Sequence, residues 1–225
     1  MSNTIEPPKP QRHALWVRVC HWVLALSVLT LAYSGFYVLM AHPRLYWGEV
    51  GNDLTPALLE LPLNDNHRPE AWRETVTFST LESKPISASR TFEIFNENGW
   101  ARSLHFLAAW FFVVAGALYF VFGVLTRHVA RDLLPGGAGP YSALQRYAYT
   151  GVAFVVLPFM VLAGFAMSPR IVAAFPALLD IFGGYQSART LHFAGFVVLV
   201  AFVVGHVAMV VLTRGRHLRA MIVGR

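Results

Sequence analysis

Four long apolar runs divide the sequence, at about residues 15–40, 104–126, 147–168 and 190–213. The hydrocarbon core of a bilayer is crossed by about 20 residues of α-helix, and each run is at least that long. We therefore predict an all-α fold, an integral membrane four-helix bundle in which residues 1–225 form a single domain. The first run is too long for the apolar part of a cleaved signal peptide, so it is expected to remain as the first span.

The composition agrees with a membrane protein. The chain of 225 residues is 56% hydrophobic and 13% charged, whereas a soluble domain has about 25% charged residues. The single cysteine, Cys20, cannot form a disulfide within the chain, and no C-x-x-C-H motif is present for covalent haem.

The basic residues lie mostly on one side of the predicted bundle. With four spans, both termini share a side with residues 127–146, and this side carries ten basic and two acidic residues. The loop 41–103 carries six basic and nine acidic residues. The positive-inside rule predicts cytoplasmic termini and a long loop outside the cytoplasm, between the first and second helices. The net charge of +6 is thus explained by topology, and no nucleic-acid partner is expected.

The long loop mixes aromatic residues with acidic residues and prolines. The aromatic residues are Trp47, Trp72, Phe92 and Phe95. This composition is too apolar for a disordered linker. We interpret the loop as an ordered cap with a surface for a partner; the alternative is a loop folded against its own helices.

Four histidines lie within the apolar runs. His192 and His206 are separated by 14 positions in the last run, which places them on one helix face about 21 Å apart. His21 lies in the first run and His105 in the second. Since successive spans alternate in direction, His21 and His206 should share the cytoplasmic depth, and His105 and His192 the opposite depth.

Two facing imidazoles at one depth suit the two axial positions of a b-type haem, so the pattern predicts two haem groups. An alternative is that these histidines only form hydrogen bonds between helices. Zinc or copper is less favoured, because two histidines are too few for a closed tetrahedral site. A proton-relay transporter would be expected to carry acidic residues within its spans, and these four runs contain none.

Further residues are candidates for the haem sites. Arginines lie near three of the four histidines: Arg18, Arg102 and Arg189. They could pair with haem propionates, or simply contact lipid headgroups. Gly35 in Y-S-G-F lies fourteen residues after His21 on the same face, and removes side-chain bulk at the depth of His192. The alternative is that Gly35 only allows two helices to approach each other.

Several motifs resemble one family. They are R-V-C-H-W in the first run, A-R-S-L-H-F at the second, A-R-T-L-H-F followed fourteen residues on by G-H, A-G-F-A-M-S-P, and the C-terminal R-H-L-R-A-M-I-V-G-R. The sequence resembles the four-helix bacterial cytochrome b subunits of NiFe-hydrogenases and formate dehydrogenases of the gamma type.

This resemblance implies a di-haem b electron-transfer subunit in the bacterial inner membrane. His105 and His192 would hold the periplasmic haem, and His21 and His206 the cytoplasmic one. Electrons would pass between quinone and a periplasmic redox subunit of the hydrogenase, molybdenum or cytochrome c type. The quinone site would lie beside the cytoplasmic haem, where the polar candidates are Tyr141, Gln145, Arg146, His128 and His217. Gln145 is the preferred candidate, although it could equally be a helix cap.

Two other functions stay open at this point. A relative of the same fold could act alone as a superoxide:quinone oxidoreductase, and a haem-free transporter is the third possibility. The long loop favours a partner subunit, because an enzyme acting alone needs an open approach to its outer haem.

Overall fold

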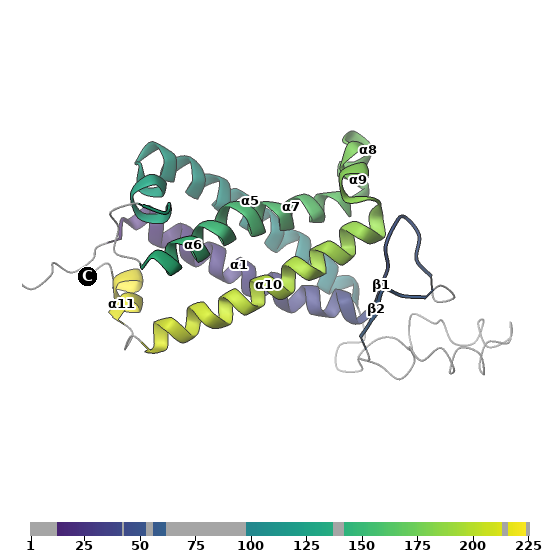
Figure 1. Cartoon of the computed structure of the whole chain (residues 1–225), viewed down its shortest axis with the longest axis horizontal. Helices are drawn as coiled ribbons and strands as arrows, with labels where there is room; N and C mark the ends of the chain where they lie inside the picture. Colours follow the sequence, from purple (N-terminus) through teal and green to yellow (C-terminus); the bar gives the residue numbers. More distant parts are fainter. Residues whose placement is uncertain are drawn as a thin grey trace, which may run out of the picture.

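The fold was examined in a computed structural model (Figure 1). The residues described are 13–41, 43–52, 56–61, 98–136, 142–212 and 216–223. Most of the predicted cap, with Trp72, Phe92 and Phe95, lies outside these ranges.

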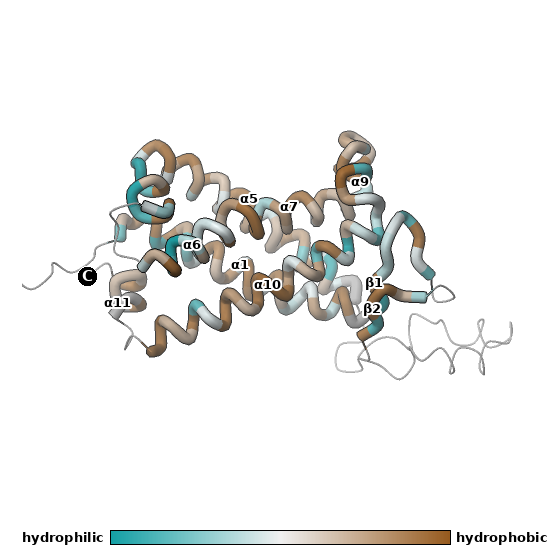
Figure 2. Tube along the Cα trace, in the orientation of Figure 1, coloured by the Kyte–Doolittle hydropathy of each residue, from teal (hydrophilic) through white to brown (hydrophobic). Residues whose placement is uncertain are grey.

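Four helical segments are long and apolar enough to cross a membrane. They are α1 (Leu15–Ala41), α5 (Asn98–Leu125), the continuous series α6 (Ala143–Gly151), η4 (Val152–Val156) and α7 (Leu157–Ala166), and α10 (Tyr185–Leu212). Figure 2 shows mainly hydrophobic residues along these segments. The predicted all-α membrane bundle is confirmed, and the chain is an integral membrane protein.

Three of these four segments begin earlier than their apolar runs: α5, the series that starts with α6, and α10. The first turns of α10 contain Gln186, Ser187, Arg189 and Thr190, which are polar but fully helical. Hydropathy detects only the part of a helix that lies in hydrocarbon, so it misses polar turns that continue the helix into the interface.

The third span changes its hydrogen bonding in the middle. Residues Val152–Val156 form a π-helical segment, and Pro158 follows it in the first turn of α7. Proline has no N–H to donate to the carbonyl four residues earlier, so the regular α-helical ladder cannot continue through this position. A proline within a span is expected to interrupt or kink the helix, and a π-segment is one of the known forms of such an interruption.

The spans pack as two antiparallel pairs. Helix α1 lies along α5, and α10 lies along α7, whereas close backbone approaches between the two pairs are much sparser. Many large apolar side chains, including Leu26, Leu29 and Trp110, are exposed on the outer surface. Lipid would cover such a surface in a membrane protein.

The two ends of the bundle carry different elements (Figure 1). The hairpin end has β1 (Arg44–Leu45) paired antiparallel with β2 (Leu59–Glu60), and the short helices α8 (Pro169–Ala174) and α9 (Ala177–Phe182). The C-terminal end has η3 (Val129–Leu133) and α11 (Arg216–Val223).

The chain just after β1 is fixed to the start of α10. The Gly48 carbonyl accepts hydrogen bonds from the backbone N–H groups of Gln186 (2.9 Å) and Ser187 (3.2 Å), and Gly48 N–H donates to Ser187 Oγ at 2.7 Å. A Cβ at Gly184 would lie 2.6 Å from the Gly48 carbonyl carbon, so only glycine allows this approach. These bonds satisfy N–H groups that a helix start leaves unpaired.

Small residues let α7 and α10 approach closely. Ala163, Ala166 and Ala188 are fully buried in a cluster with Phe182. A Cβ at Gly195 on α10 would overlap Sδ of Met160 on α7. Small residues commonly mediate close helix packing in membranes.

We expect Gly195→Val to destabilise the protein by about 1–3 kcal/mol, because the added side chain forces α7 and α10 apart. Thermal unfolding in detergent, followed by circular dichroism, should show a lower midpoint. Gly116→Ala on α5 is the matched control, since a Cβ there would meet only Leu24 Cδ2 at 3.9 Å. Equal midpoints for the two variants would contradict this account of the packing.

Candidate functional site

The structure brings the four membrane histidines together as two pairs. The ring centres of His21 on α1 and His206 on α10 are 6.3 Å apart. Those of His105 on α5 and His192 on α10 are 6.4 Å apart. Helix α10 therefore contributes one ring to each pair, and the second ring comes from a different helix each time.

Both separations suit a metal centre held between two imidazoles. With a metal–nitrogen bond of about 2 Å and a ring centre about 1.1 Å beyond the nitrogen, two rings on opposite sides of one metal have centres about 6.2 Å apart. A direct hydrogen bond between two imidazoles has nitrogens about 2.9 Å apart, which would bring the ring centres closer together. The observed spacing thus fits an intervening atom better than direct contact.

The histidine nitrogens also leave bonding capacity unused. Nδ1 of His21 and Nδ1 of His206 are buried, and neither has a hydrogen-bond partner among the residues that the structure describes. A buried polar atom without a partner is costly in a membrane. Ligation or a hydrogen bond formed around a cofactor would remove that cost.

Aromatic rings surround the pair near the C-terminal end. Phe202 stacks on His206 at 5.8 Å between ring centres, Tyr149 contacts the same ring edge-on at 6.0 Å, and Trp22 contacts His21 at 5.4 Å. There is open space beside Gly151 on α6 and Gly205 on α10, because a Cβ atom added at either glycine would have no other atom within 4 Å. An apolar wall with open space beside it is suited to a flat, largely apolar cofactor such as haem.

Glycines lie directly against the pair near the hairpin end. A Cβ at Gly35 would lie 3.2 Å from His105 Cε1, and one at Gly164 would lie 3.6 Å from His192 Cε1. Gly35 is at the expected depth but faces His105, not His192. The reason is that α1 packs along α5, so its glycine faces the histidine of that helix.

The three candidate arginines contact other protein groups. Arg18 donates from Nε to the Met221 carbonyl at 3.3 Å, and from Nη2 to the Ile222 carbonyl, so it binds the end of α11. The Arg102 guanidinium lies 5.5 Å from the centre of the Phe106 ring. Arg189 donates to Gln186 Oε1 at 3.3 Å on its own helix. Pairing of these arginines with haem propionates stays a prediction.

Gln145 serves as a helix cap. Its Oε1 accepts a hydrogen bond from the Ser142 backbone at 2.9 Å, and Ser142 Oγ accepts from its N–H at 3.3 Å, which is a capping box at the start of α6. Its Nε2 also lies 3.7 Å from Met209 Sδ on α10. Tyr141 and the side chain of His217 lie outside the described part of the chain.

Comparison with known proteins identifies the family. The sequence matches the family described as prokaryotic cytochrome b561 over residues 12–224, nearly its whole length. The chain belongs to this family. It is also 30% identical, over 94% of its own length and 96% of the relative's, to a protein of Azospira oryzae named "Putative protein-methionine-sulfoxide reductase subunit YedZ1". No solved structure gives a significant match.

Family membership confirms part of the sequence-based prediction. The chain is a cytochrome b561 protein, a membrane haem-binding electron-transfer protein. The two histidine pairs are the candidate ligands of haem iron in this chain. Among the described residues, no group of three or more histidine, cysteine or acidic side chains offers a different metal site.

Three residues beside the histidines escaped the sequence analysis. Ser34 contacts His105, and Tyr149 and Phe202 contact His206. The signal for Ser34 was present, since a polar residue inside an apolar span usually bonds to another helix. The two aromatic residues gave no such signal, because aromatic residues are common throughout these spans.

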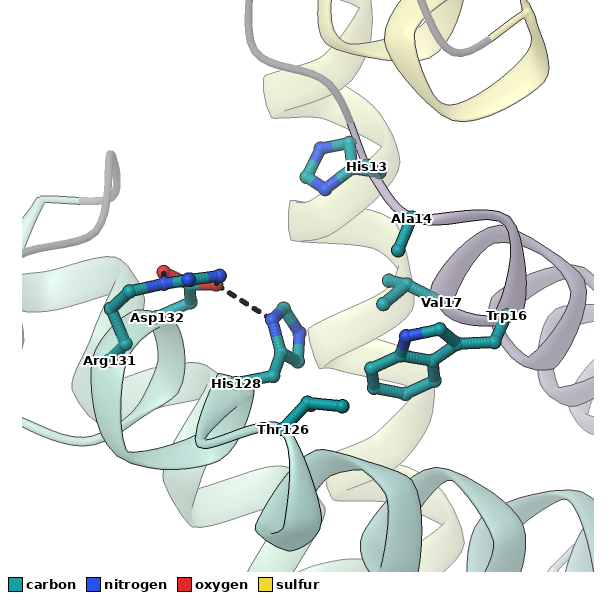
Figure 3. A pocket seen from close by; sticks show the side chains of 8 residues that line it. All are labelled: His13, Ala14, Trp16, Val17, Thr126, His128, Arg131 and Asp132. Carbon is teal, nitrogen blue, oxygen red and sulfur yellow. Dashed lines mark hydrogen bonds and ion pairs between the residues drawn. The ribbon is translucent and has the colours of Figure 1, made fainter.

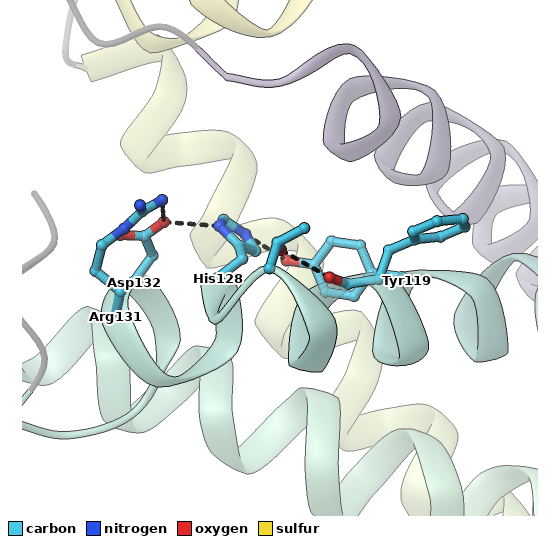
Figure 4. Close-up of polar contacts among 6 residues, drawn as sticks. Tyr119, His128, Arg131 and Asp132 are labelled. Atoms are coloured by element: carbon cyan, nitrogen blue, oxygen red, sulfur yellow. Dashed lines mark hydrogen bonds and ion pairs between the residues drawn. The ribbon is translucent and has the colours of Figure 1, made fainter.

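A second polar cluster lies at the C-terminal end. Buried His128 lies with Nδ1 2.7 Å from Asp132 Oδ2 and Nε2 3.1 Å from the Tyr119 hydroxyl (Figure 4). Beside it is a cavity of about 290 Å³ (Figure 3), lined by His13, Ala14, Trp16, Val17, Thr126, His128, Arg131 and Asp132. His13 is half-buried at this cavity.

Asp132 is held in its charged form. Hydrogen bonds from Arg131, at 2.8 Å to each carboxylate oxygen, and the neighbouring positive charges lower the pKa of Asp132, although its partial burial opposes this shift. A carboxyl group whose pKa is lower in the folded state stabilises the fold above its unfolded pKa. That contribution is lost as the pH falls through the folded pKa.

We expect Asp132→Asn to lower the unfolding midpoint at pH 7 by about 2–4 °C, a small effect because the site is partly exposed. The difference from the unsubstituted protein should shrink as the pH falls below about 4, where the carboxylate of the latter becomes protonated. Thermal unfolding from pH 7 to pH 3 measures this. Asp180→Asn, which changes an exposed residue of α9, is the control. If the effect of Asp132→Asn on the unfolding midpoint did not change with pH, the ion-pair explanation would be wrong.

Proposed function

We propose that this protein is a di-haem b electron-transfer subunit that links a redox subunit at the hairpin end to membrane quinone at the C-terminal end. The observation that carries the proposal is the pair of ring-centre separations, 6.3 Å and 6.4 Å, at two depths of one bundle. Haem b supplies reversible one-electron transfer at its iron.

In this proposal, His21 and His206 hold one haem, and His105 and His192 hold the other. The assignment is supported by the fact that each pair joins two helices that make few close contacts with each other. A planar cofactor between the two helix pairs would fill that separation. The single helix α10 sets the distance between the two sites, about 21 Å along its axis between the two ligands.

The proposed direction of insertion is supported by the charges. The basic residues near the termini favour a C-terminal end in the cytoplasm of a bacterial cell, with the hairpin end facing the periplasm. The hairpin end also carries the long segment between α1 and α5, which is the best candidate for binding a partner.

The partner is proposed to be a periplasmic redox enzyme subunit. The name of the Azospira oryzae relative describes a subunit of a protein-methionine-sulfoxide reductase, and this supports a reductase as the partner here. Electrons would then run from quinol at the C-terminal end toward the hairpin end. A hydrogenase or other oxidising partner would reverse this flow.

The pairing makes a direct prediction for histidine variants. His105→Ala and His192→Ala should each remove the same haem and leave the other, because each variant deletes one of its two axial ligands. His21→Ala and His206→Ala should remove the second haem. Haem content and reduced-minus-oxidised spectra of each purified variant provide the measurement.

His128→Ala is the matched control, because this histidine is buried but lies in the separate Tyr119–Asp132 cluster. It should retain the full haem content. If His105→Ala and His206→Ala instead lost the same spectral component, the proposed pairing would be wrong.

A further inference from the structure

Ser34 is a polar side chain in the interior of the first span. It is fully buried, with an exposed fraction of 0%, and it precedes the glycine that lies against His105. A hydroxyl group at this position must find its hydrogen bonds within the protein, because hydrocarbon offers none.

The contacts of the Ser34 hydroxyl indicate which nitrogen of His105 carries a proton. Ser34 Oγ lies 2.7 Å from the Thr30 carbonyl oxygen and 3.0 Å from His105 Nδ1. The Leu31 carbonyl oxygen is farther from Ser34 Oγ, at 3.4 Å, and it also accepts a hydrogen bond from the His105 ring. A serine hydroxyl has one proton, and a carbonyl can only accept, so Ser34 donates that proton to Thr30. The oxygen must therefore accept from His105, which donates its Nδ1–H.

This arrangement fixes the tautomer of His105. With the proton on Nδ1, the lone pair is on Nε2, which is then the nitrogen able to bind a metal. The Gly35 backbone lies beside the same ring, where a Cβ would be 3.2 Å from Cε1. Ser34 and Gly35 thus hold and orient one face of the imidazole from a neighbouring helix.

Among the described residues, no serine hydroxyl is recorded against the other three membrane histidines. Nδ1 of His192, in the same pair as His105, and Nδ1 of His21 and of His206, in the other pair, lack hydrogen-bond partners among these residues. His105 is thus the one member of the four whose Nδ1 is recorded against a hydroxyl. A histidine ligand that donates its second N–H is a stronger electron donor to its metal. A stronger donor favours the oxidised, more positively charged metal.

We infer that Ser34 is a positioning residue for the haem at the hairpin end: by accepting the Nδ1–H of His105, it orients this ligand and lowers the reduction potential of that haem alone. The inference rests on the proposed function, since it requires His105 to be an axial ligand. Ser34 would thereby make the reduction potentials of the two haems differ.

The test is a redox titration of the purified, haem-loaded protein and its Ser34→Ala variant. The variant should keep two haems, and one midpoint should move to a higher potential while the other stays unchanged. We expect a three- to tenfold change in the reduced-to-oxidised ratio at fixed potential; tenfold is about 59 mV for a one-electron couple.

Three further variants make the outcome specific. Ser34→Thr retains the hydroxyl and should keep the original potentials. Ser27→Ala removes another buried serine of α1 and should leave the hairpin-end haem unchanged. Combining Ser34→Ala with His206→Ala removes the second haem, so the shift should persist in the haem that is left.

The outcomes separate the inference from the proposed function. Two haems with unshifted potentials in Ser34→Ala would overturn the inference and leave the di-haem proposal intact, and so would a shift in the haem that depends on His206. If Ser34→Ala lost a haem and Ser34→Thr kept both at their original potentials, the role of the hydroxyl would be supported. Fewer than two haems in the unsubstituted protein would overturn the proposed function, and the inference with it.

Discussion

Burial of imidazoles in a membrane interior is the constraint on which the rest of this structure depends. A histidine in hydrocarbon is costly unless its nitrogens are bonded, and this chain buries four of them in two pairs. Small and aromatic residues lie against these rings. Gly35 and Gly164 lie beside His105 and His192, Phe202 stacks on His206, and the Ser34 hydroxyl lies 3.0 Å from His105 Nδ1. In the proposed function, binding to haem iron is the interaction that makes such burial favourable.

The architecture places these pairs by sharing one helix between them. Helix α10 contributes His192 and His206, and among the spans it packs mainly along the third, on α7, which brings no histidine. The partners, His21 and His105, come from the separate α1–α5 pair. The helices of each pair pack tightly, as Gly195 does against Met160, whereas the sparse contact between the pairs leaves space for the proposed cofactors. The hydrogen bonds from Gly48 to the start of α10 fix this helix at the hairpin end.

Much of this organisation follows from the sequence, for a physical reason. Hydropathy gives the spans, and alternating span direction gives the depth of each histidine, so the pairs that the structure brings together could be named in advance.

What the sequence could not give depends on helix rotation and on local bonding. Depth alone cannot tell which ring Gly35 faces, since that is set by α1 packing on α5. Arg18 and Gln145 lie near helix ends, where unpaired backbone groups are available as alternative partners. Arg18 binds a backbone carbonyl of α11, and Gln145 binds the backbone N–H of Ser142. The polar first turns of α10 escaped detection because they lie beyond the hydrocarbon.

The central claim is that one chain holds two haem groups between four histidines. The most direct test is the haem-to-protein ratio of the detergent-purified chain, from a pyridine haemochromogen assay and a protein determination on the same sample. We expect two b-type haems per polypeptide, both with the low-spin spectra that two axial histidines give. A ratio of one, or a high-spin spectrum, would show that at least one histidine pair does not ligate haem iron and would contradict the account.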